Sequence, residues 1–353
     1  MKTRFYVGSS SGEAKAGLRV FEINSGTGAI RQISQVDDAM DPTYLAVSAD
    51  GRFLYSTQRM APNSEGWSGG VAVYAVKGDT LEKVAEHLCA PGAPCHLSLS
   101  HNGRQLVWAE YGKAWSGAFA VGDDGLLKGA SARVRHTGKG PNPARQEAAH
   151  SHCAVTTPDD SRICVCDLGI DQVVVYDAEA KDGALRRIEG AGFRSAPGAG
   201  PRHIIFHPTA DFAFLLCELD STMVSLRHLG GGAFEEVGTY TMLPAGFSGE
   251  TKAAAVKVSP DGRWVLGSNR GCDSVAAYRL DVETGRLDLQ AISPLNGSFP
   301  RDFEFTPDGR FVVLGHKLSN EVAVYAFDGE TGRLAQVANT VSMIKPLCFV
   351  FER

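Results

Sequence analysis

The stretch Tyr44-Leu-Ala-Val-Ser-Ala-Asp-Gly-Arg-Phe-Leu-Tyr55 places two short apolar runs on either side of an Asp-Gly turn. Asx-Gly between alternating apolar residues is a strong short-range signal for a β-hairpin. The pattern returns at intervals of about 50 residues, a period typical of repeat architectures. The further copies are His96–Val107, Cys153–Val165, His203–Leu215, Val258-Ser-Pro-Asp-Gly-Arg-Trp264 and Phe305-Thr-Pro-Asp-Gly-Arg-Phe311.

Each hairpin is followed by a third apolar run and then by a more polar fourth segment. Val71-Ala-Val-Tyr74 and Val275-Ala-Ala-Tyr278 are examples of the third run, and Glu283-Thr-Gly-Arg286 forms a turn before a fourth segment. Four antiparallel strands per repeat are typical of the blades of a β-propeller. No stretch carries a convincing helical period, so the sequence predicts an all-β fold.

The two ends of the chain complement each other. Six full repeats leave Leu347-Cys-Phe-Val-Phe351 as an inner strand without a hairpin partner, and Phe5-Tyr-Val-Gly8 as a second strand without a first. Gly17–Phe21 and Ile30–Ser34 would supply the third and fourth strands. Joining both ends makes a seventh blade and leaves no open sheet edge. We therefore expect one seven-bladed β-propeller domain over residues 1–353, closed by its N- and C-terminal strands.

Composition and charge narrow the class of protein. The chain has 353 residues, more than one ordinary core supports, which agrees with a repeat. A formal net charge of -5 argues against general affinity for nucleic acid or anionic membrane. The N-terminus does not read as a signal peptide, and no run approaches the roughly 18 apolar residues of a membrane span. The eight cysteines read as reduced and buried. We expect a cytoplasmic monomer or homodimer.

Antiparallel topology predicts which residues share one end of the central channel. The inner strand of each blade starts on one face of the disc, the Asp-Gly turn lies on the other face, and the second strand returns. Starts of inner strands and ends of second strands should therefore meet at one mouth. The starts are Thr43, Cys95, His152, Arg202, Ala254 and Arg301, followed by Tyr44, His96, Cys153, His203, Ala255 and Asp302, and the ends are Gln58, Glu110, Asp167, Glu218, Asn269, Arg270, His316 and Lys317.

Arginines, imidazoles and carboxylates thus converge on one concave place, which marks a candidate active site. Taken singly, each such residue also fits a solvated or ion-paired rim position, and Arg–Asp pairs can simply join neighbouring blades. The coincidence of useful types on blades 3 to 6 favours the functional interpretation. His150 and His152 could bind a metal only with a third ligand from another blade. The sequence therefore predicts acid–base chemistry or substrate hydrogen bonding, with no metal and no cofactor.

Several of these residues belong to motifs of a known family. The run Gly138-Lys-Gly-Pro-Asn-Pro-Ala-Arg-Gln-Glu147, followed by His150-Ser-His152, resembles the signature loop of the seven-bladed lactonases typified by bacterial 6-phosphogluconolactonase. Further stretches are similar to other motifs of that family: Gly200-Pro-Arg-His203, Glu218-Leu-Asp220, Ser268-Asn-Arg-Gly271 with Asp273 and Ser274, and Pro300-Arg-Asp302. The resemblance extends nearly from end to end of the chain.

The resemblance implies hydrolysis of a phosphorylated or otherwise anionic sugar lactone, with 6-phosphogluconolactone as the first candidate. It also implies roles for individual residues. The catalytic set would be His152, Glu218, Arg202 and Arg270. The resemblance adds Arg145, Gln146 and Arg301 as substrate-binding residues, and the strand topology adds His150, His203, Asp302 and Lys317.

For the chemistry we expect Glu218 or His152 to activate a water, while two arginines hold the oxyanion. Arg301, Arg145 and Lys317 would clamp the phosphate or carboxylate of the substrate. The absence of a Gly-x-Ser-x-Gly motif argues against a covalent acyl-enzyme.

Two other functions remain open from the sequence. One is a cycloisomerase that closes a lactone on an unsaturated diacid, because the family is similar to the fungal carboxymuconate cyclase. The other is a propeller that only binds. Gln58 and Glu110 stand where relatives tend to carry Glu and Asn, and Arg59–Gly70 with Trp67 is expected to be a longer loop over the mouth. These departures leave the choice of substrate open.

Overall fold

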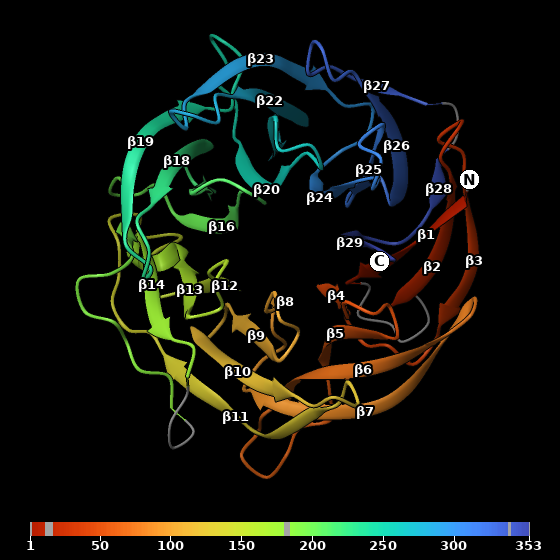
Figure 1. The fold of residues 1–353 in the computed structure, drawn as a ribbon, viewed down its shortest axis with the longest axis vertical. Helices are drawn as coiled ribbons and strands as arrows, with labels where there is room; N and C mark the ends of the chain where they lie inside the picture. Colours follow the sequence, from red (N-terminus) through yellow and green to blue (C-terminus); the bar gives the residue numbers. More distant parts are fainter. Residues whose placement is uncertain (1, 11–16, 180–183, 338–339, 353) are drawn as a thin grey trace.

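The computed structural model describes residues 2–10, 17–179, 184–337 and 340–352. Seven β-sheets surround a central axis, with the inner strand of each sheet facing the channel (Figure 1). Within the described residues the helical structure is a single 3-10 turn, η2 (Leu168–Ile170). The prediction of an all-β propeller with seven blades is confirmed.

The strands of each blade follow the chain from the channel outward. Blade 1 comprises β4 (Leu45–Val47), β5 (Phe53–Arg59), β6 (Gly69–Lys77) and β7 (Thr80–Ala90). Blade 2 comprises β8 (His96–Leu99), β9 (Gln105–Glu110), β10 (Trp115–Val121) and β11 (Leu127–Arg135). Blade 3 comprises β12 (Ser151–Thr156), β13 (Arg162–Asp167), β14 (Gln172–Asp177) and β15 (Phe193–Arg194).

Blades 4 to 6 repeat this order. Blade 4 comprises β16 (Pro201–Phe206), β17 (Phe212–Cys217), β18 (Thr222–His228) and β19 (Phe234–Thr241). Blade 5 comprises β20 (Lys252–Val258), β21 (Trp264–Arg270), β22 (Ser274–Leu280) and β23 (Leu287–Pro294). Blade 6 comprises β24 (Pro300–Phe305), β25 (Phe311–His316), β26 (Glu321–Phe327) and β27 (Leu334–Gln336), with β28 (Val341–Ser342) also paired to β26.

Blade 7 closes the ring from both ends of the chain, as predicted. Its inner strand β29 (Pro346–Phe351) pairs antiparallel with β1 (Lys2–Ser9), and Phe5 lies opposite Phe351. The strands β2 (Leu18–Asn24) and β3 (Ile30–Val36) complete the sheet. Figure 1 shows the two termini on neighbouring strands. Pairing with β29 therefore satisfies the backbone groups on the inner edge of β1, which would otherwise be free to pair with another chain.

The core lies between neighbouring blades. Phe5 and Phe21 of blade 7 pack with Phe311 and Val324 of blade 6, and equivalent clusters fill the other gaps. Residues that alternate along a strand point to opposite faces of the sheet, so each blade offers one apolar set to each neighbour. Because both faces of every sheet are buried against a neighbouring blade, the inner three strands have almost continuous apolar sequences.

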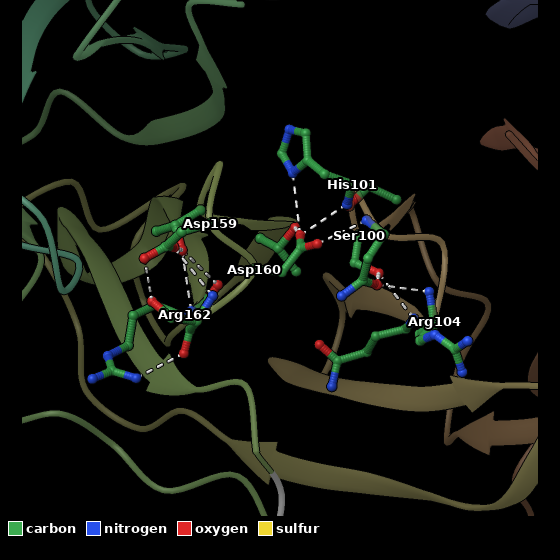
Figure 2. A network of polar contacts seen from close by, with 12 residues as sticks. Ser100, His101, Arg104, Asp159, Asp160 and Arg162 are labelled. Carbon is green, nitrogen blue, oxygen red and sulfur yellow. Dashed lines mark hydrogen bonds and ion pairs between the residues drawn. The ribbon is translucent and has the colours of Figure 1, made fainter.

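The Asp-Gly turns stabilise the face of the disc opposite the predicted mouth. Gly51, at the turn of blade 1, has a φ of 69°, a left-handed conformation that favours glycine. Figure 2 shows how the turns of blades 2 and 3 are joined: Asp160 accepts hydrogen bonds from the backbone N–H groups of His101 and Asn102, both at 2.8 Å. No helix in the described part of the chain is long and apolar enough to cross a membrane.

Candidate active site

Three predicted site residues occupy the same irregular position in their blades. Where the inner strand begins, its pairing with the second strand skips one residue in blades 3, 4 and 6. The skipped residues are His152, Arg202 and Arg301. Such β-bulges redirect a side chain away from its regular position and are frequent beside active sites. The bulges explain how one repeated position supplies the mouth with an imidazole and two guanidinium groups.

Glu218 connects three arginines that come from different parts of the ring. Its Oε1 accepts from Nη2 of Arg145 at 2.6 Å, and its Oε2 accepts from Nε of Arg202 at 2.9 Å and from Nη2 of Arg270 at 2.7 Å. Arg145 belongs to the loop between blades 2 and 3, Arg202 to β16, and Arg270 to the end of β21. The structure therefore joins three residues of the predicted catalytic set, Glu218, Arg202 and Arg270, with Arg145 of the predicted substrate-binding set in one network.

The carbonyl groups at the start of β20 complete this network. Arg270 donates from Nε to the carbonyl oxygen of Lys252 at 3.1 Å and from Nη2 to that of Ala253 at 2.7 Å. Arg202 donates from Nη1 to the carbonyl oxygen of Ala254. These contacts orient both guanidinium planes before any ligand arrives, which is the preorganisation that oxyanion stabilisation requires.

The arginines also set the charge of Glu218. Burial would raise the pKa of this carboxyl group, but Arg270 and Arg202 outweigh that effect and hold the pKa well below its usual range. The same crowding acts on the cations: burial and the nearby Arg202 and Arg301 lower the pKa of Arg270, although Glu218 opposes them. Glu218 is thus a permanent carboxylate at neutral pH.

His152 lies buried beside this network in an uncharged state. Burial and the positive charge of Arg202 keep the pKa of its imidazole well below the ordinary value. Its ring meets those of His203 and Tyr111 edge to face, at 5.3 and 5.6 Å between centroids. Its buried Nδ1 has no hydrogen-bond partner among the described residues. A neutral imidazole with an unpartnered nitrogen can exchange a proton with a bound ligand or water.

Arg301 and Lys317 supply positive charge that is not neutralised. In the described part of the chain, neither side-chain cation forms a hydrogen bond or an ion pair with another residue. Burial together with Arg202 lowers the pKa of Arg301 to about 10. Lys317 lies over the ring of Phe299 at 5.4 Å, and the guanidinium of Arg270 lies 5.2 Å from the same ring. The mouth is therefore electrostatically prepared for an anion.

Two residues that we predicted to bind substrate hold the signature loop. Gln146 is fully buried, and its Nε2 donates to the carbonyl oxygen of Leu168 at 2.9 Å and to Asp171 at 2.7 Å. Both ring nitrogens of His150 are engaged, one with the carbonyl oxygen of Tyr111 and one with Glu147, each at 3.1 Å. Because these polar groups already have partners inside the protein, they position the loop that carries Arg145, and the substrate contact that we predicted for them stays a prediction.

The second residues of the bulged strands point deeper. Nη1 of Arg202 lies 3.0 Å from Nε2 of His203, so this imidazole accepts from the guanidinium and orients it. Asp302 accepts from the backbone N–H of Phe349 at 3.3 Å, and its other oxygen lies 3.8 Å from Nζ of Lys257. Asp302 is therefore engaged with Phe349 and Lys257, and the substrate contact that we predicted for it stays a prediction.

Other predicted mouth residues have hydrogen-bond partners outside the Glu218 network. Glu110 accepts from the backbone N–H groups of Gly112 and Lys113, and Asp167 accepts from His136 at 2.7 Å. Gln58 donates to the hydroxyl of Tyr74. The segment around Trp67 was expected to cover the mouth, but that ring packs on Trp115 and Arg133 in the outer strands of blade 2. A strand-end position alone did not distinguish these residues from Glu218.

Sequence reasoning missed two aromatic residues. The ring of Tyr111 stacks on His150 at 4.4 Å, and its hydroxyl accepts from Arg145 at 3.4 Å. Phe299 contacts both Arg270 and Lys317 with its ring and has a φ of 66°, a strained conformation for a bulky residue. Each directly adjoins a position that we did consider, Glu110 and Pro300 respectively. The sequence signal that could have identified both aromatic residues is their position next to predicted mouth residues.

The two neighbouring histidines do not form a metal centre. Among the described residues, no group of three or more His, Cys, Asp or Glu side chains is arranged to hold a metal ion. The charged groups that act on the pKa of His152 are three arginines and Glu218, and the excess of positive charge opposes a bound cation. The arrangement suits an anionic ligand.

Comparisons with known proteins agree with the geometry. Residues 4–351 match the family model for "Lactonase, 7-bladed beta-propeller". A 6-phosphogluconolactonase of Bacillus subtilis is 33% identical over 349 residues, which cover 98% of this chain and 97% of that protein. A periplasmic gluconolactonase of Pseudomonas aeruginosa superimposes with a TM-score of 0.91 at 28% identity, covering 100% of this chain and 99% of the other.

A protein of Lactobacillus plantarum has a TM-score of 0.90 at 29% identity, and the alignment covers both chains completely. The predicted family is thus confirmed on sequence and on structure, and with it the expectation of an enzyme that hydrolyses lactones. The chain belongs to the lactonase family of seven-bladed β-propellers.

Proposed function

We propose that the mouth hydrolyses a lactone that carries a phosphate or another anionic group, and that 6-phosphogluconolactone is the first substrate to test. The observation that carries the proposal is the pair of cations, Arg301 and Lys317, without a protein counter-ion beside the Glu218 network. The Bacillus subtilis relative is named for the phosphorylated lactone and the Pseudomonas aeruginosa relative for gluconolactone. A phosphate-binding pair of cations favours the first kind of substrate.

His152 is the better candidate for the general base. A general base must be unprotonated at working pH and must have a free acceptor near the substrate. His152 is neutral, and its ring nitrogens form no hydrogen bond with any described residue, whereas both oxygens of Glu218 already accept from arginines. We infer that Glu218 orients the arginines and that His152 takes a proton from the attacking water.

The remaining steps use the same groups. Attack of water on the lactone carbonyl places negative charge on the carbonyl oxygen, and Arg202 and Arg270 would stabilise it. When the ring C–O bond breaks, the protonated His152 would return its proton to the departing alkoxide. Arg301 and Lys317 would hold the phosphate away from the reacting bond. A cytoplasmic location belongs to the same proposal, because all eight cysteines are free thiols.

The proposal is tested by comparing a phosphorylated with an unphosphorylated gluconolactone on the wild-type protein and on Arg301→Ala. Loss of a charge-assisted hydrogen bond costs about 1.5–3 kcal/mol, so kcat/KM for the phosphorylated lactone should fall by roughly 10- to 150-fold. The unphosphorylated lactone should change by less than about threefold, because it makes no such contact.

Arg310→Ala provides the matched control, because Arg310 lies on the opposite face and donates to the carbonyl oxygen of Ser25. It should leave both rates unchanged. Equal hydrolysis of the two lactones by the wild-type protein would reject a phosphate clamp. A uniform loss for both lactones in Arg301→Ala would move Arg301 from substrate binding to the chemical step.

A further inference from the structure

A cysteine, a histidine and a second cysteine meet directly behind His152. Cys153 follows His152 on β12, and its Sγ lies 3.4 Å from Nε2 of His96, on the inner strand of blade 2. Both residues line the cavity of the central channel, which has a volume of about 310 Å³. Thiol and imidazole within hydrogen-bond reach form the arrangement that activates cysteine nucleophiles.

Cys166 lies opposite Cys153 in the pairing of β12 with β13. Directly opposed residues of antiparallel strands have Cβ atoms about 4.5–5.5 Å apart. A disulfide needs a Cβ separation of about 3.5–4.5 Å. A small approach of the two strands therefore brings the sulfur atoms within bonding distance, and no large rearrangement of blade 3 is required.

The surroundings distinguish Cys153 from the other buried cysteines. Burial opposes ionisation of Cys153, but a hydrogen bond from Cys166 and the nearby His96 outweigh it and lower the pKa of its thiol. Burial instead raises the pKa of Cys164 and of Cys217, which share the same core cluster. Cys153 thus combines an activating neighbour, access from the channel cavity and a potential disulfide partner.

We propose that Cys153 is a hydroperoxide-reactive thiol, that Cys166 resolves it to a disulfide, and that this oxidation reversibly inhibits the adjacent active-site mouth. Hydrogen peroxide is the smallest member of the substrate class and fits a polar cavity of this size. The proposal concerns chemistry that is separate from lactone hydrolysis. Only its inhibitory consequence rests on the proposed function.

The reaction balances without a further reagent. The sulfur of Cys153 attacks one peroxide oxygen while Nε2–H of His96 donates to that sulfur, the O–O bond breaks, and the departing oxygen takes the thiol proton and leaves as water. Cys153 is then a sulfenic acid. The sulfur of Cys166 displaces the hydroxyl group, which leaves as a second water with the Cys166 proton. Two thiols have lost two electrons in total, and the peroxide has gained them.

The disulfide would act on the mouth through the strand that carries His152. Drawing Cys153 toward β13 changes the bulge that directs the His152 side chain. Catalytic groups must be held within about 0.5 Å of their productive position. Oxidation should therefore lower lactone hydrolysis, and a dithiol reductant should restore it.

The test compares four proteins after a short treatment with hydrogen peroxide: wild type, Cys153→Ser, Cys166→Ser and Cys164→Ser. Cys164 is the matched control, because it lies on β13 with Cys166 and is as buried as Cys166, but it lies opposite Val155 rather than opposite a thiol. Peptide mass spectrometry should find a Cys153–Cys166 disulfide in wild type and in Cys164→Ser. Cys166→Ser should stop at a sulfenic acid on Cys153, which dimedone traps, and Cys153→Ser should form neither product.

A disulfide between other cysteines, or oxidation of Cys166 in Cys153→Ser at the wild-type rate, would overturn the assignment. His96→Leu gives a second route if Cys153→Ser folds poorly, and it should slow oxidation of Cys153 by at least about tenfold because it removes the N–H group that stabilises the thiolate. The mass readout is independent of lactonase activity. Full activity in protein that carries the disulfide would reject the inhibitory role, whereas inactivity of the reduced protein toward every lactone would reject the proposed function.

Discussion

The two faces of the disc use the same residue types in opposite ways. On the turn face, Asp261 pairs with Arg263 at 2.6 Å, two residues along the chain, and both side chains are about half exposed. At the mouth, Glu218 pairs with Arg145, Arg202 and Arg270, and its side chain is almost completely buried. One face neutralises its charges within a turn, while the other gathers charges from several blades.

The difference shows what each arrangement can do. An exposed pair contributes about 0–1 kcal/mol, because water and salt screen it. Its task is local, and Figure 2 shows that Asp160, which reaches the neighbouring blade, accepts there from backbone N–H groups and contacts the exposed ring of His101 at 3.2 Å. A buried cluster keeps its electrostatic strength, so uncompensated cations beside it remain available for a ligand. The comparison between the two faces leads to three predictions.

The largest expected effect is on stability. Glu218→Gln removes the charge that the three arginines share, and breaking a buried pair costs about 3–5 kcal/mol of the free energy of unfolding. Because the pKa of Glu218 is depressed, its stabilising charge is fully present above its ordinary pKa of about 4.3, so the loss should be constant from roughly pH 6 to pH 8. Asp261→Asn should cost less than about 1 kcal/mol. Denaturant unfolding checks both, and equal losses would contradict the comparison.

The second effect is on the rate. Arg202→Ala should lower kcat by at least about 100-fold, or roughly 3 kcal/mol, because one preorganised oxyanion donor is lost. Arg263→Ala, on the turn face, should leave kcat unchanged and stability within about 0.5 kcal/mol. Steady-state kinetics on the best lactone separates the two variants. Near-parental kcat in a folded Arg202→Ala protein would show that this mouth is not where the reaction occurs.

The smallest effect is on the pH profile. The depressed pKa of His152 means that its neutral form persists below the range in which histidines ordinarily gain a proton. If His152 had the ordinary histidine pKa of about 6.5, half of the molecules would carry a protonated imidazole at about pH 6.5, and kcat/KM would be about half of its maximum. We expect kcat/KM to stay constant from neutral pH down to about 6.5 and to decline only in more acidic solution. A twofold loss by pH 6.5 would contradict a buried, neutral base.

Much of the fold could be predicted because it follows from local patterns. Asp-Gly turns between alternating apolar runs depend on neighbours within a few residues, as in the hairpin around Gly51. The complementary ends of the chain predicted the closing blade, which pairs Phe5 with Phe351. The antiparallel topology of the repeat also placed Arg202, Glu218 and Arg270 at one mouth, where the structure joins them.

The tasks of individual polar residues could not be predicted in this way. Gln146 and Arg145 are adjacent in the sequence. The amide of Gln146 forms hydrogen bonds to Leu168 and Asp171, whereas the side chain of Arg145 reaches Glu218. Arg301 and Asp302 are also adjacent, yet the bulge directs the first to the mouth and leaves the second beside Lys257. Sequence periodicity cannot distinguish these outcomes, because a shift of one residue reverses the direction of a side chain.

By itself, the sequence determined the number of blades, the all-β class, the closing blade and the lactonase motifs. Turn chemistry and side-chain alternation act over a few residues, so these features are written locally in the chain. Only the tertiary structure decided which charges neutralise one another and which remain free for a ligand. That outcome depends on distances between groups that lie tens of residues apart, such as Arg145 and Glu218, and these distances exist only after the ring has closed.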